Sequence, residues 1–284
     1  MAIKTYLGQT PINQVYLGQT LINKEYVGPT VPNILAPSDL ASLTFWYDYS
    51  SYSGSIWYDK NSYNYDLNVS GNLASASLVD NGVAITGWGN VGWTGSVTES
   101  LLTPGNQEAL HNTTYLTWIK PQEGYLYQPV GALANAQPVF QLSAVGASSL
   151  FSISKTLSGS GNGVVDIFPS GAIEVDTPFG EPTSSYIGAD ITSSLWTMVT
   201  VVIDTEGSQS RYKNLDLYDS SAVTPSSTFS TSSGAFAIAT DFTTNGNVGW
   251  SGSIGAVMRF DEQLSFAKIQ GIYNYYSQSA GYVV

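Results

Sequence analysis

The sequence predicts an all-β protein: a two-sheet jelly-roll sandwich with one short C-terminal helix and a small N-terminal arm of β repeats. Three observations lead to this prediction. The 284 residues are 43% hydrophobic, which is enough for one large sandwich core. Apolar and polar residues alternate in roughly a dozen short runs separated by turn residues. The first part of the chain repeats itself every ten residues.

Composition limits the partners that this chain can have. Only 11% of its residues are charged, and 21 acidic against 9 basic side chains give a net charge of −12. Because no cationic track is available for phosphates, nucleic-acid binding and adhesion to an anionic membrane are not expected. A surface rich in hydroxyls, amides and phenols suits contact with sugars or with protein neighbours. The sequence has no cysteine, which excludes disulfides and thiolate metal sites.

The N-terminal arm, residues 1–32, contains three copies of a ten-residue unit, the third of them degenerate. Each copy places a β-prone pair before a glycine that can take the positive φ of a tight turn. The arm is too small to bury its tyrosines alone, so we expect it to dock on sister chains or on another protein. A simple three-strand decoration of the main domain is the alternative. The predicted anchor residues are Tyr6, Leu7, Gly8, Tyr16, Leu17, Gly18, Tyr26, Val27 and Gly28.

A proline-rich segment follows the arm. Residues 33–39 are predicted to be a semi-rigid linker, and residues 40–284 to be the jelly-roll domain. Within that domain the alternation of apolar residues predicts strands throughout. The predicted strands are residues 43–48, 56–59, 84–88, 114–121, 139–142, 150–153, a hairpin formed by 163–168 and 172–175, then 196–204, 215–218 and 235–239.

The chain closes with a strand and a helix. Ile254, Ala256, Met258 and Phe260 alternate with other residues and predict one apolar inner face. After Ser265, a plausible N-cap, apolar residues recur at helical spacing. This apolar stripe consists of Phe266, Ile269, Ile272, Tyr273 and Tyr276.

Several phrases in this order resemble the concanavalin A-like, laminin G-like jelly rolls. They are LTFWYD at 43–48, SIWYDKN at 55–61, YLTWIKP at 115–121, WTMVTV at 196–201, and the closing strand with its helix. The resemblance covers residues 40–278. It implies a fold used by lectins, glycan-cleaving enzymes, adhesion modules and virion proteins. Separately, the Tyr-Leu-Gly-Gln-Thr repeat is similar to short N-terminal repeats of bacteriophage structural proteins.

Catalytic chemistry finds little support in the sequence. The glycanases with this fold use two carboxylates on alternate positions of one strand. The nearest match is Glu174-Val175-Asp176, but the final acid is missing and Pro178 ends the strand. The one histidine, His111, cannot form a zinc site by itself. We therefore predict no catalytic residue and no enzyme.

Sugar binding would use aromatic rings in loops. The candidate glycan contacts are Tyr49, Tyr52, Tyr63, Tyr65, Tyr125 and Tyr127. The same rings are equally consistent with a protein–protein interface. In contrast, Trp46, Trp118 and Trp196 alternate into strands and are expected in the core. The one cofactor considered is calcium, at Asp48 and Asp59, with ordinary turn-capping roles for these carboxylates as the alternative.

Together these features predict a non-enzymatic structural protein of a bacteriophage virion. It would be a capsid decoration, head fibre or tail fibre and adhesin subunit, anchored by its arm and displaying a lectin-like domain. Expected partners are other virion proteins, sister copies and a host cell-surface glycan, with no nucleic acid and no membrane insertion. Because no signal peptide is recognisable, synthesis in the host cytoplasm and location in the virion are expected. The alternatives are a stand-alone carbohydrate-binding lectin and, less favoured, a glycan-cleaving enzyme. The sequence leaves head or tail location, oligomeric state and the glycan open.

Overall fold

The protein forms two compact units, Met1–Pro32 and Asn33–Val284, in the computed structural model. The structure describes the following residues: 5–7, 10–12, 16–17, 20–21, 33–61, 65–71, 76–85, 91–97, 112–121, 124–127, 136–144, 149–156, 164–167, 173–176, 185–187, 195–206, 208–221, 234–239, 250 and 252–282. In this part of the chain, no helix is long and apolar enough to cross a membrane.

The first unit contains two short antiparallel hairpins. They are formed by β1 (Thr5–Leu7) with β2 (Thr10–Ile12), and by β3 (Tyr16–Leu17) with β4 (Thr20–Leu21). Tyr6 lies opposite Pro11, and Tyr16 lies opposite Leu21. The pairing within the first copy of the repeat therefore has the same register as the pairing within the second copy. Each of these copies is therefore one hairpin with a two-residue connection. The predicted anchors Gly8, Gly18, Tyr26, Val27 and Gly28 lie outside the described residues.

The second unit is a sandwich of two eight-stranded antiparallel sheets, which confirms the all-β prediction. We call the first the helix-covered sheet. Its order is β20 (Asp216–Ser221), β19 (Gln209–Lys213), β18 (Thr197–Ile203), β11 (Thr113–Pro121), β22 (Gly252–Phe260), β9 (Gly82–Ile85) and β8 (Ala76–Val79), with β5 (Leu43–Asp48) beside β22.

We call the second the polar-faced sheet. Its order is β17 (Ser185–Ile187), β16 (Ile173–Asp176), β14 (Ser149–Thr156), β13 (Ala136–Ala144), β21 (Gly234–Ile238), β10 (Val91–Val97), β7 (Leu67–Gly71) and β6 (Ile56–Trp57). A separate pair joins β12 (Gly124–Tyr127) to β15 (Val164–Ile167). The predicted hairpin of 163–168 with 172–175 is therefore wrong, since β16 pairs with β14 and β17 instead.

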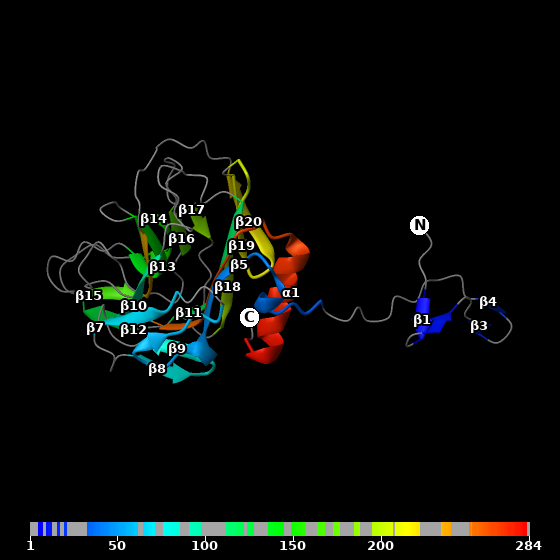
Figure 1. The fold of residues 1–284 in the computed structure, drawn as a ribbon, viewed down its shortest axis with the longest axis horizontal. Helices are drawn as coiled ribbons and strands as arrows, with labels where there is room; N and C mark the ends of the chain where they lie inside the picture. The colour runs from blue at the N-terminus through cyan, green and yellow to red at the C-terminus, as the bar shows by residue number, and fades with distance from the viewer. Residues whose placement is uncertain are drawn as a thin grey trace. The chain divides into compact units, whose positions relative to one another are not determined.

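The central strands of the helix-covered sheet are buried on both faces, and helix α1 (Phe266–Ser279) covers one face of the sheet (Figure 1). All seven residues of β18 are buried. Met198 and Val202 belong to the apolar cluster that includes the helix residues Ile269 and Ile272, whereas the alternating residue Val201 is buried outside that cluster. A strand buried on both sides reads as a continuous apolar run, which is how this segment appears in the sequence.

The closing strand differs from its prediction at Ile254, which does not share a face with the other three predicted residues. Ala256, Met258 and Phe260 pack in the cluster with α1, so the predicted apolar face is buried there against the helix. The pairing with β11 shifts register around Gly255, which leaves Ile254 outside the helix-side cluster. Strict alternation predicted a single face because a one-residue bulge cannot be read from periodicity.

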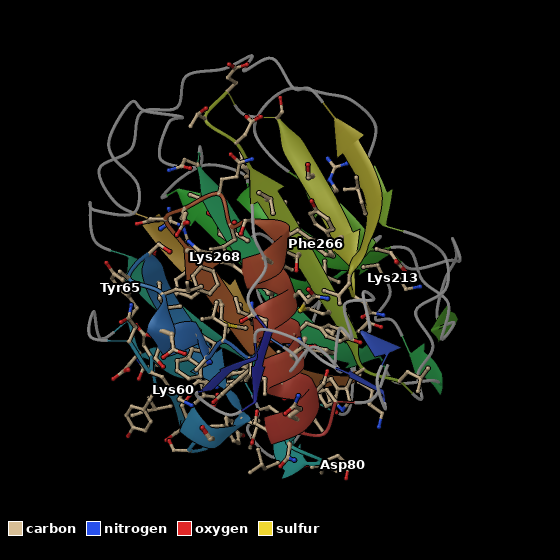
Figure 2. The ribbon with its side chains drawn as sticks, turned by 90° about the vertical axis from the view of Figure 1, so that its right-hand side faces the viewer. Lys60, Tyr65, Asp80, Lys213, Phe266 and Lys268 are labelled. Carbon is tan, nitrogen blue, oxygen red and sulfur yellow. The ribbon has the colours of Figure 1, made fainter. Side chains whose placement is uncertain are left out.

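The helix prediction is confirmed, and Ser265 occupies the N-cap with an extended backbone, although its side chain makes no capping hydrogen bond. Ile269, Ile272 and Tyr276 are buried on the sheet. Figure 2 shows α1 in front of the strands, with Phe266 at its upper end. Phe266 was predicted in the buried stripe, but it is 47% exposed because it starts the helix at the margin of the sheet.

Residues 33–39, predicted as a linker, belong to the second unit and lie along α1. The Leu35 amide donates to the Gly271 carbonyl (3.0 Å), and the Asn274 side chain donates to the Asn33 carbonyl (2.8 Å). A Cβ on Gly271 would lie 2.6 Å from the Leu35 Cβ, so glycine permits this close approach. A composition rich in proline therefore marks a docked segment here, not a spacer.

Candidate functional site

The polar-faced sheet has two chemically different faces, because apolar and polar residues alternate along parts of β7, β13 and β14. One row of paired residues crosses the sheet on the core side. It consists of Val69, Trp93, Ile238, Phe140, Ile153 and Val175. Ile238 is fully buried, as are Trp57 and Leu67 further along the same face. This face closes the sandwich core.

The opposite face carries hydroxyl, amide and carboxyl residues. One row runs through Asn68, Thr94, Ala237, Gln141, Ser152 and Asp176. A neighbouring row joins Ser154, Glu174 and Tyr186. We call these nine residues the polar face. Among these nine residues the structure describes the exposure of two: Asn68 is exposed and Ala237 is fully buried.

The chemistry of the polar face matches what a sugar requires. Carboxylate, amide and hydroxyl groups donate to or accept from sugar hydroxyls, and a tyrosine ring offers a stacking surface. Glu174 and Asp176 are two residues apart on β16, so their Cα atoms are about 6.6 Å apart on one face. Rigid strands hold such groups at fixed spacing more precisely than loops do.

The sequence located part of this face. It identified Glu174 and Asp176 as the nearest carboxylate pair, and β16 ends at Asp176, before Pro178. It missed Gln141, Ser152 and Tyr186, which pairing brings toward those carboxylates. The alternation of apolar and polar residues in β13 and β14 carried a signal for the first two, but only the strand order joins them.

Of the six predicted loop tyrosines, the structure describes the side chains of three, Tyr49, Tyr52 and Tyr65, and all three are partly or fully buried. Tyr49 packs against the helix-side core, and Tyr52 packs edge-on against Trp57 at a centroid distance of 5.8 Å. Burial raises the pKa of both phenols. Tyr65 is only 8% exposed, and its carbonyl accepts a hydrogen bond from Tyr47. These contacts favour a structural role for all three predicted residues.

The structure does not describe the side chains of the remaining three predicted tyrosines. Tyr125 and Tyr127 belong to β12, which pairs with β15. Tyr63 lies outside the described residues, as does His111. An exposed ring that the sequence reading did not select is Tyr58, at 45% exposure. Trp46, Trp118 and Trp196 are buried, as predicted.

Asp48, one of the two predicted calcium ligands, stabilises the turn that follows β5. Its Oδ1 accepts from the Ser50 amide (2.9 Å) and hydroxyl (2.6 Å). Its Oδ2 pairs with Lys60 (2.8 Å), whose ammonium also lies 3.8 Å from the centre of the Trp46 ring. This carboxylate therefore serves as a turn cap and a counter-ion.

Asp59, the other predicted ligand, is 8% exposed and accepts three backbone amides. They belong to Trp46 (2.9 Å), Asn61 (3.0 Å) and Tyr65 (3.3 Å). Burial raises the pKa of the Asp59 carboxyl, while these amides act in the opposite direction. Among the described residues, no three acidic or histidine side chains cluster as a metal site. Calcium at Asp48 and Asp59 stays a prediction, and the turn-capping alternative describes the contacts they make.

A second polar row lies on the core side of the helix-covered sheet. Cross-strand pairing aligns Arg211, Val201, Tyr115 and Arg259. Both arginines are 3% exposed, and Arg259 pairs with Asp261 at 2.9 Å. Burial raises the pKa of the Tyr115 phenol, so it stays protonated and able to donate. Buried charges need such partners, and we assign this row to the structure of the core.

Comparison with known proteins shows the fold. No family model and no curated protein matches the chain. Sialidase of Trypanosoma rangeli in complex with sialic acid is 17% identical, with a TM-score of 0.59 over 88% of this chain and 36% of that chain. Domain 4 of AbnA, a GH43 extracellular arabinanase from Geobacillus stearothermophilus, in complex with arabinotriose, is 15% identical, with a TM-score of 0.52 over 82% of this chain and 98% of that chain.

The binding domain of botulinum neurotoxin DC, in complex with rat synaptotagmin II, is 14% identical and has a TM-score of 0.50 over 82% of this chain and 51% of that chain. At these identities the likeness supports a lectin-like β-sandwich and nothing finer. The chain spans about a third of the length of the sialidase.

These matches correct one prediction. The sequence reading concluded that the chain is not an enzyme, but the matched structures include a sialidase and a domain of an arabinanase, which are glycan-cleaving enzymes. The absence of the glycanase strand motif and of a histidine zinc site does not by itself exclude catalysis. Catalysis on a glycan therefore remains among the functions considered below.

Proposed function

We propose that this protein recognises a glycan through the polar face of its second sheet. The observation that carries the proposal is the cross-strand row of Thr94, Gln141, Ser152 and Asp176, flanked by Glu174 and Tyr186. The net charge of −12 and the low content of charged residues agree with a neutral ligand rich in hydroxyl groups. The similar structures described above include an arabinanase domain in complex with arabinotriose, a neutral oligosaccharide, which supports the same class of ligand.

Titration with panels of oligosaccharides tests this proposal. Gln141→Ala and Tyr186→Ala should each weaken binding about 10-fold, since each removes a hydrogen bond or stacking contact of about 1.4 kcal/mol. Gln270→Ala is the matched control, because Gln270 is an exposed glutamine on α1, away from the polar face. Binding that survives the polar-face changes, or that is lost with Gln270→Ala, would refute this location for the site.

Glycan cleavage is the second candidate, favoured by the position of Glu174 and Asp176 on one face of β16. Hydrolysis of a glycosidic bond uses two carboxyl groups, one as acid and one as nucleophile or base. Their Cα atoms are about 6.6 Å apart. From that spacing the two carboxyl groups can reach the shorter separation used by retaining enzymes or the longer one used by inverting enzymes. Glu174→Gln and Asp176→Asn should then abolish turnover while oligosaccharide binding is retained. If the unchanged protein binds oligosaccharides but does not cleave them, glycan cleavage is excluded and glycan recognition is the function that remains.

We infer further that the first unit anchors the chain in a larger assembly, and a bacteriophage particle is the assembly we favour. The support is its construction: a compact unit of repeated hairpins, separate from the sandwich. Partners would be other virion proteins and sister copies, with the sandwich presented to a host glycan. Bacteriophage particles incubated with the full chain should carry it into the pellet on sedimentation. A truncated chain of residues 33–284 should stay in the supernatant. Equal retention of both would contradict an anchoring role.

A further inference from the structure

The two edges of the helix-covered sheet are protected very differently. Its strand order ends at β20 on one side and β8 on the other. β20 contains Asp216 and Asp219, and charges on an edge discourage pairing with another chain. β8 has the sequence Ala-Ser-Leu-Val and contains no charge, no proline and no shift in its pairing with β9. Leu78 is nevertheless 54% exposed and Val79 is 47% exposed.

The turn that follows β8 fixes which of its backbone groups face outward. Asp80 (φ 49°) and Asn81 (φ 58°) form a two-residue hairpin turn between Val79 and Gly82. The residues flanking such a turn exchange both hydrogen bonds, and hydrogen-bonded and non-hydrogen-bonded pairs then alternate along the strands. The N–H and C=O groups of Leu78 and Ala76 therefore point away from β9, toward the side on which the order of the described strands ends.

We propose that β8 pairs with β8 of a second copy of this chain, which joins two helix-covered sheets into one. An antiparallel arrangement with its two-fold axis at Ser77 places Ala76 opposite Leu78 of the second copy, and Leu78 opposite its Ala76. This register is self-complementary, as a two-fold interface requires. It satisfies the outward groups of both residues on both strands with four hydrogen bonds.

Charge limits where two copies of the chain can meet. At a net charge of −12, two copies repel one another over most of their surfaces. β8 is an edge where they can meet without bringing carboxylates together, whereas pairing at β20 would oppose Asp216 and Asp219. The contact lies on a different sheet from the polar face. It therefore goes beyond the proposed function, and it would leave two glycan-binding faces available in one particle.

Matched substitutions at the two edges test the pairing in the full chain. Leu78→Lys and Leu217→Lys change the same residue type at similar exposure, 54% and 57%, on opposite edges of the sheet. The molar mass from sedimentation equilibrium should be halved by Leu78→Lys and unchanged by Leu217→Lys. An unchanged mass for Leu78→Lys would overturn the proposal, and so would an equal effect of both changes. A wild-type chain that is still monomeric at about 100 μM, roughly 100-fold above a micromolar dissociation constant, would overturn it as well.

Cross-linking provides an independent measurement that does not depend on how Leu78→Lys folds. The chain has no cysteine, so one introduced thiol can react only with its counterpart. In the proposed register Ser77 faces Ser77 of the second copy as a non-hydrogen-bonded pair, with Cα atoms about 4.5 Å apart, which a disulfide can span. Oxidised Ser77→Cys should run as a covalent dimer on a non-reducing gel, and Ser220→Cys on β20 should not. Failure of Ser77→Cys to cross-link, or equal cross-linking of both variants, would refute the register.

Discussion

At the scale of single residues, the aromatic cluster between α1 and the helix-covered sheet is held by a few specific polar bonds. Trp46 donates its indole N–H to the Tyr276 hydroxyl at 2.6 Å. Tyr282 lies between Trp118 and Trp196, with ring centroids 5.0 and 4.3 Å away. Burial strongly raises the pKa of the Tyr276 phenol, so it remains neutral across the physiological range. Tyr276 and Tyr282 thus contribute apolar area while their hydroxyls keep partners, the Trp46 indole and the Asn81 carbonyl.

Tyr276→Phe tests the cost of breaking such a bond. The change retains the ring but leaves the buried Trp46 N–H without its acceptor, which should lower the free energy of unfolding by about 1–3 kcal/mol. Urea denaturation measures the difference. Tyr273→Phe is the control, because Tyr273 packs at the margin of the same cluster and is only partly buried. Equal losses for both variants would show that the Trp46 bond has no special role.

Glu262→Gln tests a charge effect with a defined sign. A hydrogen bond from Lys268, and then one from Ser42, hold the pKa of the Glu262 carboxyl below its usual range. A carboxyl with a lowered folded pKa stabilises the protein above its ordinary pKa, and that stabilisation is lost as the pH falls through the folded value.

The unchanged protein should therefore be more stable than Glu262→Gln at pH 7, and the difference should shrink below a pH of about 4. Denaturation curves at several pH values provide the measurement. A difference that grows on acidification would contradict the assigned sign.

At the scale of elements, the bulge in β22 and the C-terminal tail depend on each other. Gly255 falls out of the pairing with β11, and a Cβ at this position would lie 2.6 Å from the Tyr282 ring. The Tyr282 hydroxyl donates to the Asn81 carbonyl (2.7 Å), and the Asn81 side chain donates to the Ala280 carbonyl (3.1 Å). The tail therefore links the closing strand to the β8–β9 turn, beside Asp80 in Figure 2.

Gly255→Ala should displace Tyr282 and lower the free energy of unfolding by about 1–3 kcal/mol. In a Tyr282→Ala background the same change should cost less, because the obstructing ring is absent. A double-mutant cycle from urea denaturation measures this coupling. Additive effects of the two changes would show that the ring and the glycine are independent.

At the scale of the whole molecule, the second unit begins at residue 33 and not after the proline-rich segment. The contacts of Asn33 and Leu35 with α1 are part of its structure. Removing residues 1–32 should therefore leave its melting temperature unchanged.

Removing residues 1–39 should lower that melting temperature by about 4 °C, since about 1–2 kcal/mol is lost with the Leu35 hydrogen bond and packing. Calorimetry of the two truncated chains against the full chain measures the effect. A large loss on removing residues 1–32 alone would mean that the two units stabilise each other.

The sequence by itself determined the class of fold, most of the strands, the closing helix and the buried tryptophans. These follow from periodicity and apolar content, which are local properties. It also identified Glu174 and Asp176, because two positions on one strand share a face whatever the fold. It assigned the wrong surroundings to residues whose neighbours are distant in the chain, as with Tyr65 and Phe266.

The tertiary structure alone decided which strands are neighbours. It joined Asn68, Gln141 and Asp176 in one polar row, and it left β8 as an uncharged edge. Pairing order and layer order arise from the packing of segments separated by tens of residues, and no local pattern encodes them. For the same reason the carboxylates of Asp48 and Asp59 could be found in the sequence, but the donors that surround them could not.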